Sequence, residues 1–174
     1  MTTGTGTTVA TMFLEHSRRQ LFIEWWPRMR DTVEALSEEQ LWWRPNEASN
    51  SIGNLLLHLS GNVRQWLVTS FHRREDQRHR SAEFAEKAGG PASEVLARLG
   101  ETLDEAAAVL SHLTEKDLLA PMDIQGYHVT GLGAVYHVVE HFGMHYGQII
   151  YIAKALQNKD LGFYSELNKT GRAS

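Results

Sequence analysis

Apolar side chains recur every three or four residues along four long stretches of the chain, and this spacing most limits how it can fold. The stretches cover about residues 9–35, 51–72, 92–113 and 131–157. Such spacing places the apolar side chains on one face of an α-helix, whereas a half-buried strand would alternate apolar and polar residues. We find no convincing strand alternation. Four long helices in one domain predict an all-α fold, a four-helix bundle.

Local signals refine these helices. Ser51 stands directly before the second stretch and is expected to cap its amino end. Pro27 lies inside the first stretch and has no backbone N–H, so we expect a kink or a break near Trp26. The fourth stretch is apolar on most sides, which predicts that it is the most deeply buried.

A short pattern occurs twice, in Leu36-Ser-Glu-Glu-Gln-Leu41 and in Leu113-Thr-Glu-Lys-Asp-Leu118, each with a proline three or four residues further on. Each copy is followed by a hydroxyl residue seven positions before a histidine, namely Ser51 before His58 and Thr130 before His137. Two interpretations remain open: a duplication of helix, capped turn and helix, or two capped turns of common composition.

Composition excludes several classes of protein. The chain has no cysteine, which excludes a disulfide scaffold, a cysteine-ligated metal centre and a cysteine nucleophile. Its net charge of −4 argues against a nucleic-acid or acidic-membrane partner. No apolar run approaches the roughly 20 residues of a membrane span, and the start MTTGTGTTVA does not resemble a signal peptide. We therefore expect a cytoplasmic protein, with the bundle at 9–157 between a disordered start (1–8) and a polar tail (158–174) anchored by Phe163 and Tyr164.

Histidine is the unusual residue type, with nine copies in 174 residues. His137, His141 and His145 follow one another at intervals of four, which places neighbouring imidazoles one turn apart on one helical face, where two can share a metal ion. At about 100° per residue, the apolar stripe of this helix centres near His145, with His141 close to the centre and His137 at the margin. We expect His141 and His145 to point inward and His137 to lie at the edge.

The role of His58 stays open from spacing alone. It interrupts an apolar run in the second stretch but lies about 100° from the centre of that helix's apolar stripe. It can be a metal ligand or a hydrogen-bonded histidine of the core. The other histidines, at positions 16, 72, 79, 112 and 128, stand in polar surroundings, and we expect them to be solvated.

A set of three histidines would favour catalysis over a purely structural role. Two buried imidazoles with nothing to bind are costly, and a shared cation relieves that cost. Three neutral imidazoles leave a divalent ion its full charge and open positions, as in catalytic sites. Gln148, one turn after His145, is a candidate to support a ligand or to contact substrate. No carboxylate ligand is evident, since Glu140 is off the inward face.

The chain resembles the DinB-like superfamily in two segments, Asn50-Ser-Ile-Gly-Asn-Leu-Leu-Leu-His-Leu-Ser-Gly-Asn62 and His141-Phe-Gly-Met-His-Tyr-Gly-Gln-Ile-Ile-Tyr-Ile-Ala-Lys154. It looks closest to an uncharacterised bacterial branch marked by N-S-I…H-L-x-G-N and H-x-x-x-H-x-G-Q-I. The segment Arg78-His-Arg-Ser-Ala-Glu-Phe84 is also similar to that branch. The resemblance covers about residues 10–157.

This resemblance implies a four-helix bundle of the DinB-like type that holds zinc or nickel on His58, His141 and His145. Members are commonly homodimers. Some relatives transfer a low-molecular-weight thiol to electrophiles or use it to isomerise maleylpyruvate, and many have no assigned activity. The usual His-His-Arg-Gly-Gln of the superfamily is Met144-His145-Tyr-Gly-Gln148 here, so the second His and the Arg are missing, and so is any anion contact by that Arg. The superfamily name reflects damage induction and is no sign of DNA binding.

Two further features bear on a pocket. The segment 72–80 carries four arginines and two acids and is expected to be a solvated helix end and linker. If it overhangs the metal site, Arg78 or Arg80 is placed to hold the carboxylates of a thiol cosubstrate. Trp66, two turns beyond His58, is a candidate to line the pocket, the alternative being a place in the core or at a dimer interface.

The leading hypothesis is a metal-dependent enzyme that activates an external low-molecular-weight thiol, or water, for attack on a small electrophilic substrate. Thiol transfer stands ahead of hydrolysis only through the resemblance, since a fold does not determine a function. The alternatives are a metal-dependent hydrolase, a non-catalytic metal-binding bundle, and a helical dimerisation module whose histidines only fill the core.

Overall fold

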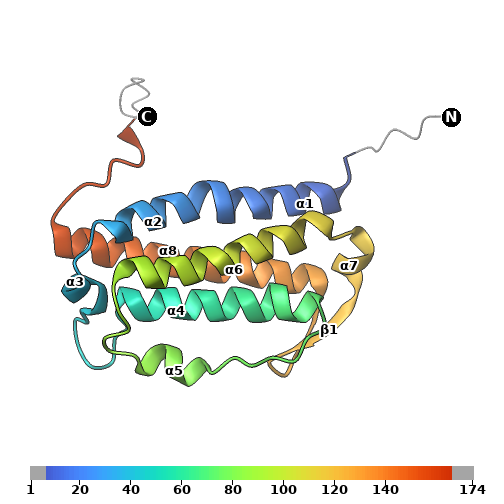
Figure 1. Ribbon diagram of the computed structural model, residues 1–174. Helices are drawn as coiled ribbons and strands as arrows, with labels where there is room; N and C mark the ends of the chain where they lie inside the picture. Colours follow the sequence, from blue (N-terminus) through green and yellow to red (C-terminus); the bar gives the residue numbers. More distant parts are fainter. Residues whose placement is uncertain (1–6, 166–174) are drawn as a thin grey trace.

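Four long helical rods form the framework of the protein (Figure 1). The computed structural model describes residues 7–165. In chain order the rods consist of α1 (Val9–Arg18), the π-helix η1 (Arg19–Trp25) and α2 (Trp26–Glu34); α4 (Ile52–Val63) and the π-helix η2 (Arg64–Thr69); α6 (Ala92–His112); and α8 (Gly131–Gln157). The expected all-α bundle is confirmed, and the third and fourth rods end within a residue of their expected bounds.

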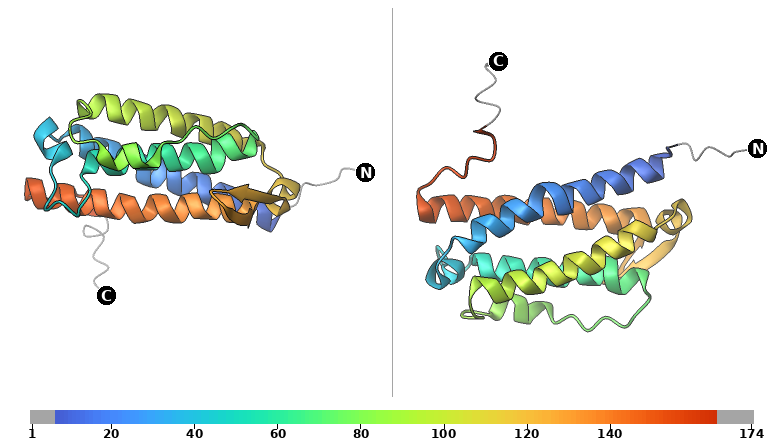
Figure 2. Two further views of the ribbon diagram at one scale, coloured as in Figure 1. Left: turned by 90° about the horizontal axis from the view of Figure 1, so that it is seen from below. Right: turned by 45° about the horizontal axis from the view of Figure 1, so that its top comes forward.

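The rods pack as a ring in which consecutive rods are not always neighbours. The main contacts join α1 and α2 with α6 and α8, and join α4 with α6 and α8 (Figure 2). The first rod therefore stands diagonally across from α4, and α6 stands across from α8. Two of the three connections between rods therefore cross a diagonal, and all three contain short elements of their own.

Pro27 interrupts the first rod in an unexpected manner. The helix passes into the π-helical segment η1 directly before the proline, which occupies one of the first two positions of α2. A proline there is tolerated because its missing N–H belongs to the group of donors that the start of a helix leaves unpaired. The expected break near Trp26 thus takes the form of a wider helical turn within one continuous rod.

The two diagonal connections begin alike. Ser37 caps the amino end of α3 (Glu38–Trp42), and Thr114 caps that of α7 (Glu115–Leu119). Each cap residue forms a complete capping box with the third residue of its helix. Each short helix leads to the capped start of a long one, at Ser51 for α4 and at Thr130 for α8. The repeated sequence pattern therefore corresponds to a repeated order of long helix, short capped helix and long helix.

A β-hairpin between α7 and α8 corrects the expectation of a chain without strands. β1 (Pro121–Ile124) pairs antiparallel with β2 (Tyr127–Thr130), with Ile124 opposite Tyr127. The connecting residues Gln125 and Gly126 both have positive φ, as a two-residue hairpin turn requires. Ile124 is the fully buried side chain of the hairpin, and the other positions remain partly or fully exposed.

The expectation that the fourth rod is the most deeply buried is wrong. Ten of the 12 residues of α4 are buried, against seven of the 27 residues of α8. α4 is covered on its outer side by α5 (Arg80–Ala85), a short helix that packs against it (Figure 1). α8 instead keeps one face exposed, where large apolar side chains such as Tyr136, Met144 and Tyr151 reach solvent.

The structure describes only part of the two expected tails. Residues 1–6 and 166–174, which belong to the expected disordered start and polar tail, lie outside the described residues. The aromatic anchor pair is described: the guanidinium of Arg28 lies 5.6 Å from the ring centre of Phe163 and 5.7 Å from that of Tyr164. Within residues 7–165, no helix has the length and apolar character to cross a membrane.

Candidate metal centre

Three histidines meet where α4 packs against α8. His58 projects from α4, and His141 and His145 project from consecutive turns of α8. The Nε2 atom of His141 lies 3.1 Å from Nε2 of His58 and 3.2 Å from Nε2 of His145. Among residues 7–165, these three side chains form the one group of potential ligands able to hold a metal ion.

The spacing of the three nitrogens fits a metal ion. Zinc binds imidazole nitrogen at about 2.0–2.1 Å, so two nitrogens on a tetrahedral ion stand roughly 3.3–3.4 Å apart. The two Nε2–Nε2 distances of 3.1 and 3.2 Å approach this value. Without a cation, the three nitrogens would face one another with at most one proton to share in each contact.

The position of His58 resolves a question that its helical phase leaves open. His58 is only 4% exposed although it lies to one side of the expected apolar stripe of α4. The phase argument assumes a helix buried on one face, whereas α5 covers the second face of α4. His58 is thereby enclosed between α5 and α8.

A buried carboxylate orients His58. Glu83 on α5 lies with its Oε2 atom 2.9 Å from Nδ1 of His58, and its pKa is lowered, so it is an acceptor at neutral pH. The Nδ1–H of His58 therefore donates to Glu83, which leaves the lone pair on Nε2 facing the other two histidines. Hydrogen bonds of this kind commonly fix the tautomer of metal-binding histidines.

Arg78 compensates the charge of Glu83. Its Nε donates to Oε1 at 2.7 Å and its Nη2 donates to Oε2 at 2.8 Å, while its Nη1 donates to Gln65. The side chains of Arg78 and Glu83 are 5% and 9% exposed. Burial raises the pKa of Glu83, but the hydrogen bonds and charges of Arg78 and His58 outweigh this and hold the pKa below its ordinary value. The expectation that the segment 72–80 is a solvated linker is therefore wrong at Arg78.

The amino end of α4 fixes α5 and with it Glu83. Asn54 donates through Nδ2 to the backbone carbonyls of Glu83 at 2.9 Å and Glu86 at 2.8 Å, while its Oδ1 accepts from the backbone N–H of the cap residue Ser51. Arg44 donates to Asn54 and to two carbonyls at the end of α5. The Asn50-to-Asn54 segment thus holds α5, which is too short to hold itself in place.

Gly61 lets the carboxylate approach α4. A β-carbon at this position would collide with the carboxylate of Glu83 and would lie 2.8 Å from Nε of Arg78. Because both side chains are tied to each other and to His58, neither has a free direction in which to move. The glycine of the H-L-x-G-N pattern is therefore required by the packing of the ion pair.

His145 has an orienting partner as well, whereas His141 has none. Nδ1 of His145 lies 2.7 Å from Oε1 of Gln148, which places Gln148 in the expected supporting position. Nδ1 of His141 is buried and has no hydrogen-bond partner among the described residues. The Nε2 atom is thus the one site where His141 can satisfy its polarity.

The three imidazoles on α8 are held neutral. Burial, followed by the nearby histidines, lowers the pKa of His141 to about 3. Burial also lowers the pKa of His137 and of His145, although the Gln148 hydrogen bond opposes the shift at His145. Metal ligands must be deprotonated, so protons compete little for His141 over the ordinary pH range.

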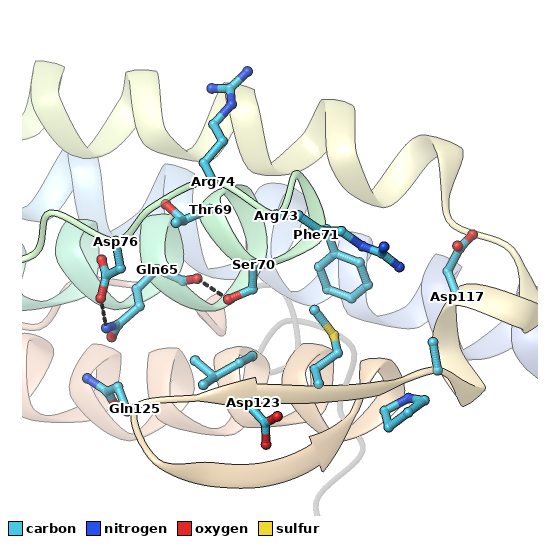
Figure 3. A pocket seen from close by; sticks show the side chains of 14 residues that line it. Gln65, Thr69, Ser70, Phe71, Arg73, Arg74, Asp76, Asp117, Asp123 and Gln125 are labelled. Atoms are coloured by element: carbon cyan, nitrogen blue, oxygen red, sulfur yellow. Dashed lines mark hydrogen bonds between the residues drawn. The ribbon is translucent and has the colours of Figure 1, made fainter.

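A cavity of about 700 Å³ opens beside the cluster. His58 and His141 form part of its wall, together with four residues expected near the site: Trp66, Arg78, Arg80 and His137. His137 does not join the cluster but stacks on Trp66 with ring centres 3.9 Å apart, and its Nε2 contacts the Nδ2 of Asn62 at 3.1 Å. A second cavity lies on the other side of the hairpin, between η2 and β1 (Figure 3), and shares Gln125 with the first.

Several residues of the site escaped the sequence analysis: Asn54, Asn62, Glu83, Gln125 and Tyr127. Glu83 stands in a segment noted only for its resemblance to a family, and no periodicity marks it because α5 has six residues. The hairpin had a signal in the dipeptide Gln125-Gly126, which follows Met122-Asp-Ile124 and precedes Tyr127-His-Val129. Glu140 is exposed, as its phase predicts.

Three solved structures are similar in fold. A conserved protein from Enterococcus faecalis is 15% identical, with a TM-score of 0.69 over 88% of this chain and 99% of its own. A DinB-like protein from Bacillus subtilis is 19% identical, with a TM-score of 0.64 over 88% and 96% of the two chains. A DinB-like protein from Bacillus cereus ATCC 10987 is 15% identical, with a TM-score of 0.63 over 83% and 91%. At these identities the likeness shows the fold, and the expected DinB-like fold is confirmed.

The sequence comparisons agree with the resemblance to an uncharacterised branch. Residues 8–167 match the model of a family described as a protein of unknown function, DUF1572. No curated protein matches the chain at a significant level.

We predict that Glu83→Gln destabilises the metal-free protein far more than the same change at Glu105. Glu83→Gln leaves the buried charge of Arg78 uncompensated, which costs about 3 kcal/mol or more. Glu105 forms a comparable pair with Arg64, but both side chains are more than 40% exposed, and exposed pairs contribute less than about 1 kcal/mol. Urea unfolding of both variants measures the difference; equal losses would show that the Arg78–Glu83 pair is not buried in solution.

We also predict that the metal-free protein loses stability as the pH falls from 6.5 to 4.5. The pKa of His141 drops from 6.5 to about 3 on folding, so the unfolded chain takes up the proton first and unfolding is favoured as the pH falls below 6.5. Glu83 adds to the loss only below its ordinary pKa of 4.5. Urea unfolding at several pH values should give a shallower dependence for His141→Asn; identical slopes would contradict the assignment.

Proposed function

The chain belongs to the DUF1572 family, whose function is unknown, and we propose that it is a metal-dependent enzyme with a divalent ion on His58, His141 and His145. The observation that carries the proposal is the convergence of three Nε2 atoms on one point, two of them on imidazoles oriented through Nδ1. Zinc or nickel is the ion that the resemblance to the DinB-like superfamily implies, and neutral imidazole suits both. A divalent ion in such a set lowers the pKa of a bound thiol or water and so supplies a nucleophile at neutral pH.

The residues around the cluster have separate tasks in this proposal. Glu83 and Gln148 hold His58 and His145 in the orientation that turns Nε2 to the ion. Trp66, stacked on His137, forms a fixed wall of the cavity where a small electrophile would lie beside the cluster. The cavity is large enough for a small organic molecule together with the end of a thiol cosubstrate, since ligand pockets measure roughly 300–1,000 Å³.

Thiol transfer to an electrophile is the reaction that we place first, and hydrolysis is the alternative. Support for thiol transfer comes only from the resemblance to the DinB-like superfamily. Because the chain has no cysteine, the thiol in this reaction would come from outside. A non-catalytic metal-binding bundle would share the same ligands and differ only in having no reaction.

We predict that the protein binds about one divalent ion per chain and loses it when a ligand is removed. His58→Ala, His141→Ala and His145→Ala should each abolish stoichiometric binding of zinc or nickel, measured by mass spectrometry of untagged protein. His137→Ala is the matched control, because His137 stands one turn before His141 but its Nε2 contacts Asn62. Full metal content in the three ligand variants would refute the site.

Activity separates the remaining functions once metal binding is known. The metal-loaded protein is incubated with monochlorobimane and a low-molecular-weight thiol, and thioether formation is followed by fluorescence; hydrolysis of p-nitrophenyl acetate is followed in parallel. Thiol-dependent turnover that His141→Ala lacks supports transfer, and ester hydrolysis without thiol supports a hydrolase. Stoichiometric metal with neither reaction supports the non-catalytic bundle.

We further propose that the protein is a homodimer that pairs through the exposed face of α8. Tyr136, Met144 and Tyr151 stand on this face with more than half of each side chain exposed, and a β-carbon at Gly147 would meet no atom within 4 Å, which leaves room for close approach. Light scattering should give twice the chain mass of 19.7 kDa. Tyr151→Glu should yield the monomer, and Ile23→Glu, at an exposed apolar position on the first rod, should not; a monomeric wild type would contradict the proposal.

A further inference from the structure

The cavity beside the histidine cluster has no acidic residue in its wall. Its lining includes Arg78 and Arg80, three histidines and the amides of Asn62 and Gln125, but neither Asp nor Glu. This is unexpected in a chain with 21 acidic residues and a net charge of −4. Four other cavities of the described structure each have at least two carboxylates in their walls.

The neighbouring cavity makes the contrast clear. Across the hairpin, the wall contains Asp76, Asp117 and Asp123 as well as Arg73 and Arg74 (Figure 3). Both cavities share Gln125 at the hairpin turn. Basic and acidic side chains are therefore mixed in the wall of this cavity, whereas the charged side chains in the wall of the cavity beside the histidine cluster are basic.

Arg80 supplies the free positive charge of the cavity. The charge of Arg78 is matched by Glu83, which lines a different cavity. Arg80 is exposed, and the salt bridges found within residues 7–165 do not include it. Its guanidinium lies 4.9 Å from the ring centre of Phe84, which packs against it without neutralising its charge. A planar guanidinium held on an aromatic face keeps its N–H groups free for a carboxylate.

Two more features describe what the cavity can hold. Asn62 is only 3% exposed; its Nδ2 pairs with His137, while its Oδ1 has no partner among the described residues. This oxygen only accepts, so a hydrogen-bond donor on the body of a ligand, and not its carboxylate, would satisfy it. Trp66, Val129 and Tyr127 form an apolar part of the same wall, which suits a hydrocarbon body.

We propose that this cavity binds a small organic carboxylate, with its anionic group at Arg80 and its apolar body against Trp66, Val129 and Tyr127. Such a molecule lies beside His58 and His141 and is the substrate class of the enzyme. This last step rests on the proposed function, whereas binding of the anion does not require a metal.

The test compares benzoate with benzamide, which has nearly the same shape but no charge. Each is titrated into the ¹⁵N-labelled full-length protein without metal and at about 0.1 M salt, where charges more than about 10 Å apart are screened, and the indole N–H signal of Trp66 is followed by NMR, with Trp66→Phe used to assign it. We expect benzoate to shift this signal and to bind at least about tenfold more tightly than benzamide, in line with a charge-assisted contact.

Two arginine variants of equal charge locate the anion. Arg80→Gln should weaken benzoate binding about three- to tenfold and leave benzamide unchanged. Arg98→Gln, an exposed change on α6 outside this cavity, should alter benzoate binding less than about twofold, because distant surface charges are screened. Equal binding of the two probes, equal effects of the two variants, or the absence of a shift at Trp66 would each overturn the proposal.

The outcome is separate from that of the metal experiment. Benzoate binding that depends on Arg80 in a protein that takes up no zinc or nickel would support the anion cavity and refute the metal-dependent enzyme. Stoichiometric metal with no preference for benzoate would refute the carboxylate and retain the metal centre.

Discussion

The carboxylate of Glu83 is the group on which the geometry of the site depends. It accepts hydrogen bonds from Arg78 and from His58 in the interior, next to α4. Removal of Arg78 would leave the buried charge of Glu83 unpaired. Removal of the Glu83 carboxylate would leave the charge of Arg78 unpaired and would free the imidazole of His58 to rotate. This explains why so much of the surrounding sequence, including Asn54, Arg44 and Gly61, fixes a helix of only six residues. The role of α5 is to hold the carboxylate of Glu83 against Nδ1 of His58.

The histidines of the cluster and the groups that hold them have hydrogen-bond partners within residues 7–165, except for one nitrogen of His141 at the centre. Asn54 holds α5, Glu83 holds His58, and Gln148 holds His145, whereas the Nδ1 of His141 has no partner among the described residues. Burial and the neighbouring histidines also make protonation of His141 unfavourable, with a pKa of about 3. Without a ligand this centre is costly, and three converging lone pairs form a group that could hold a metal ion.

Helical periodicity predicted the rods, but it could not predict the connections. The bounds 131–157 follow from one long amphipathic pattern, and the phases of His141 and His145 followed from it. Glu83 and the hairpin belong to segments too short for a periodic signal, where long-range contacts decide the structure. The burial of α4 and α8 was inferred in the wrong order, because apolar content does not reveal which helix a short element such as α5 will cover. The phase of His58 was uninformative for the same reason.

The exposed face and the histidine face belong to the same helix, α8, and this links the proposed dimer to the proposed metal centre. His145 and Met144 are adjacent residues, Gln148 lies one turn after them and Tyr151 about one turn after Gln148, so the orienting partner of His145 stands beside the surface proposed for dimerisation. A second copy covering Met144 and Tyr151 would exclude water from the Gln148–His145 hydrogen bond and strengthen it, since hydrogen bonds are stronger in a low-dielectric surrounding. The cavity with Arg80 opens at a different wall of the cluster, past His58 and His141. Association of two chains through the exposed face of α8 would therefore strengthen the hydrogen bond that orients His145.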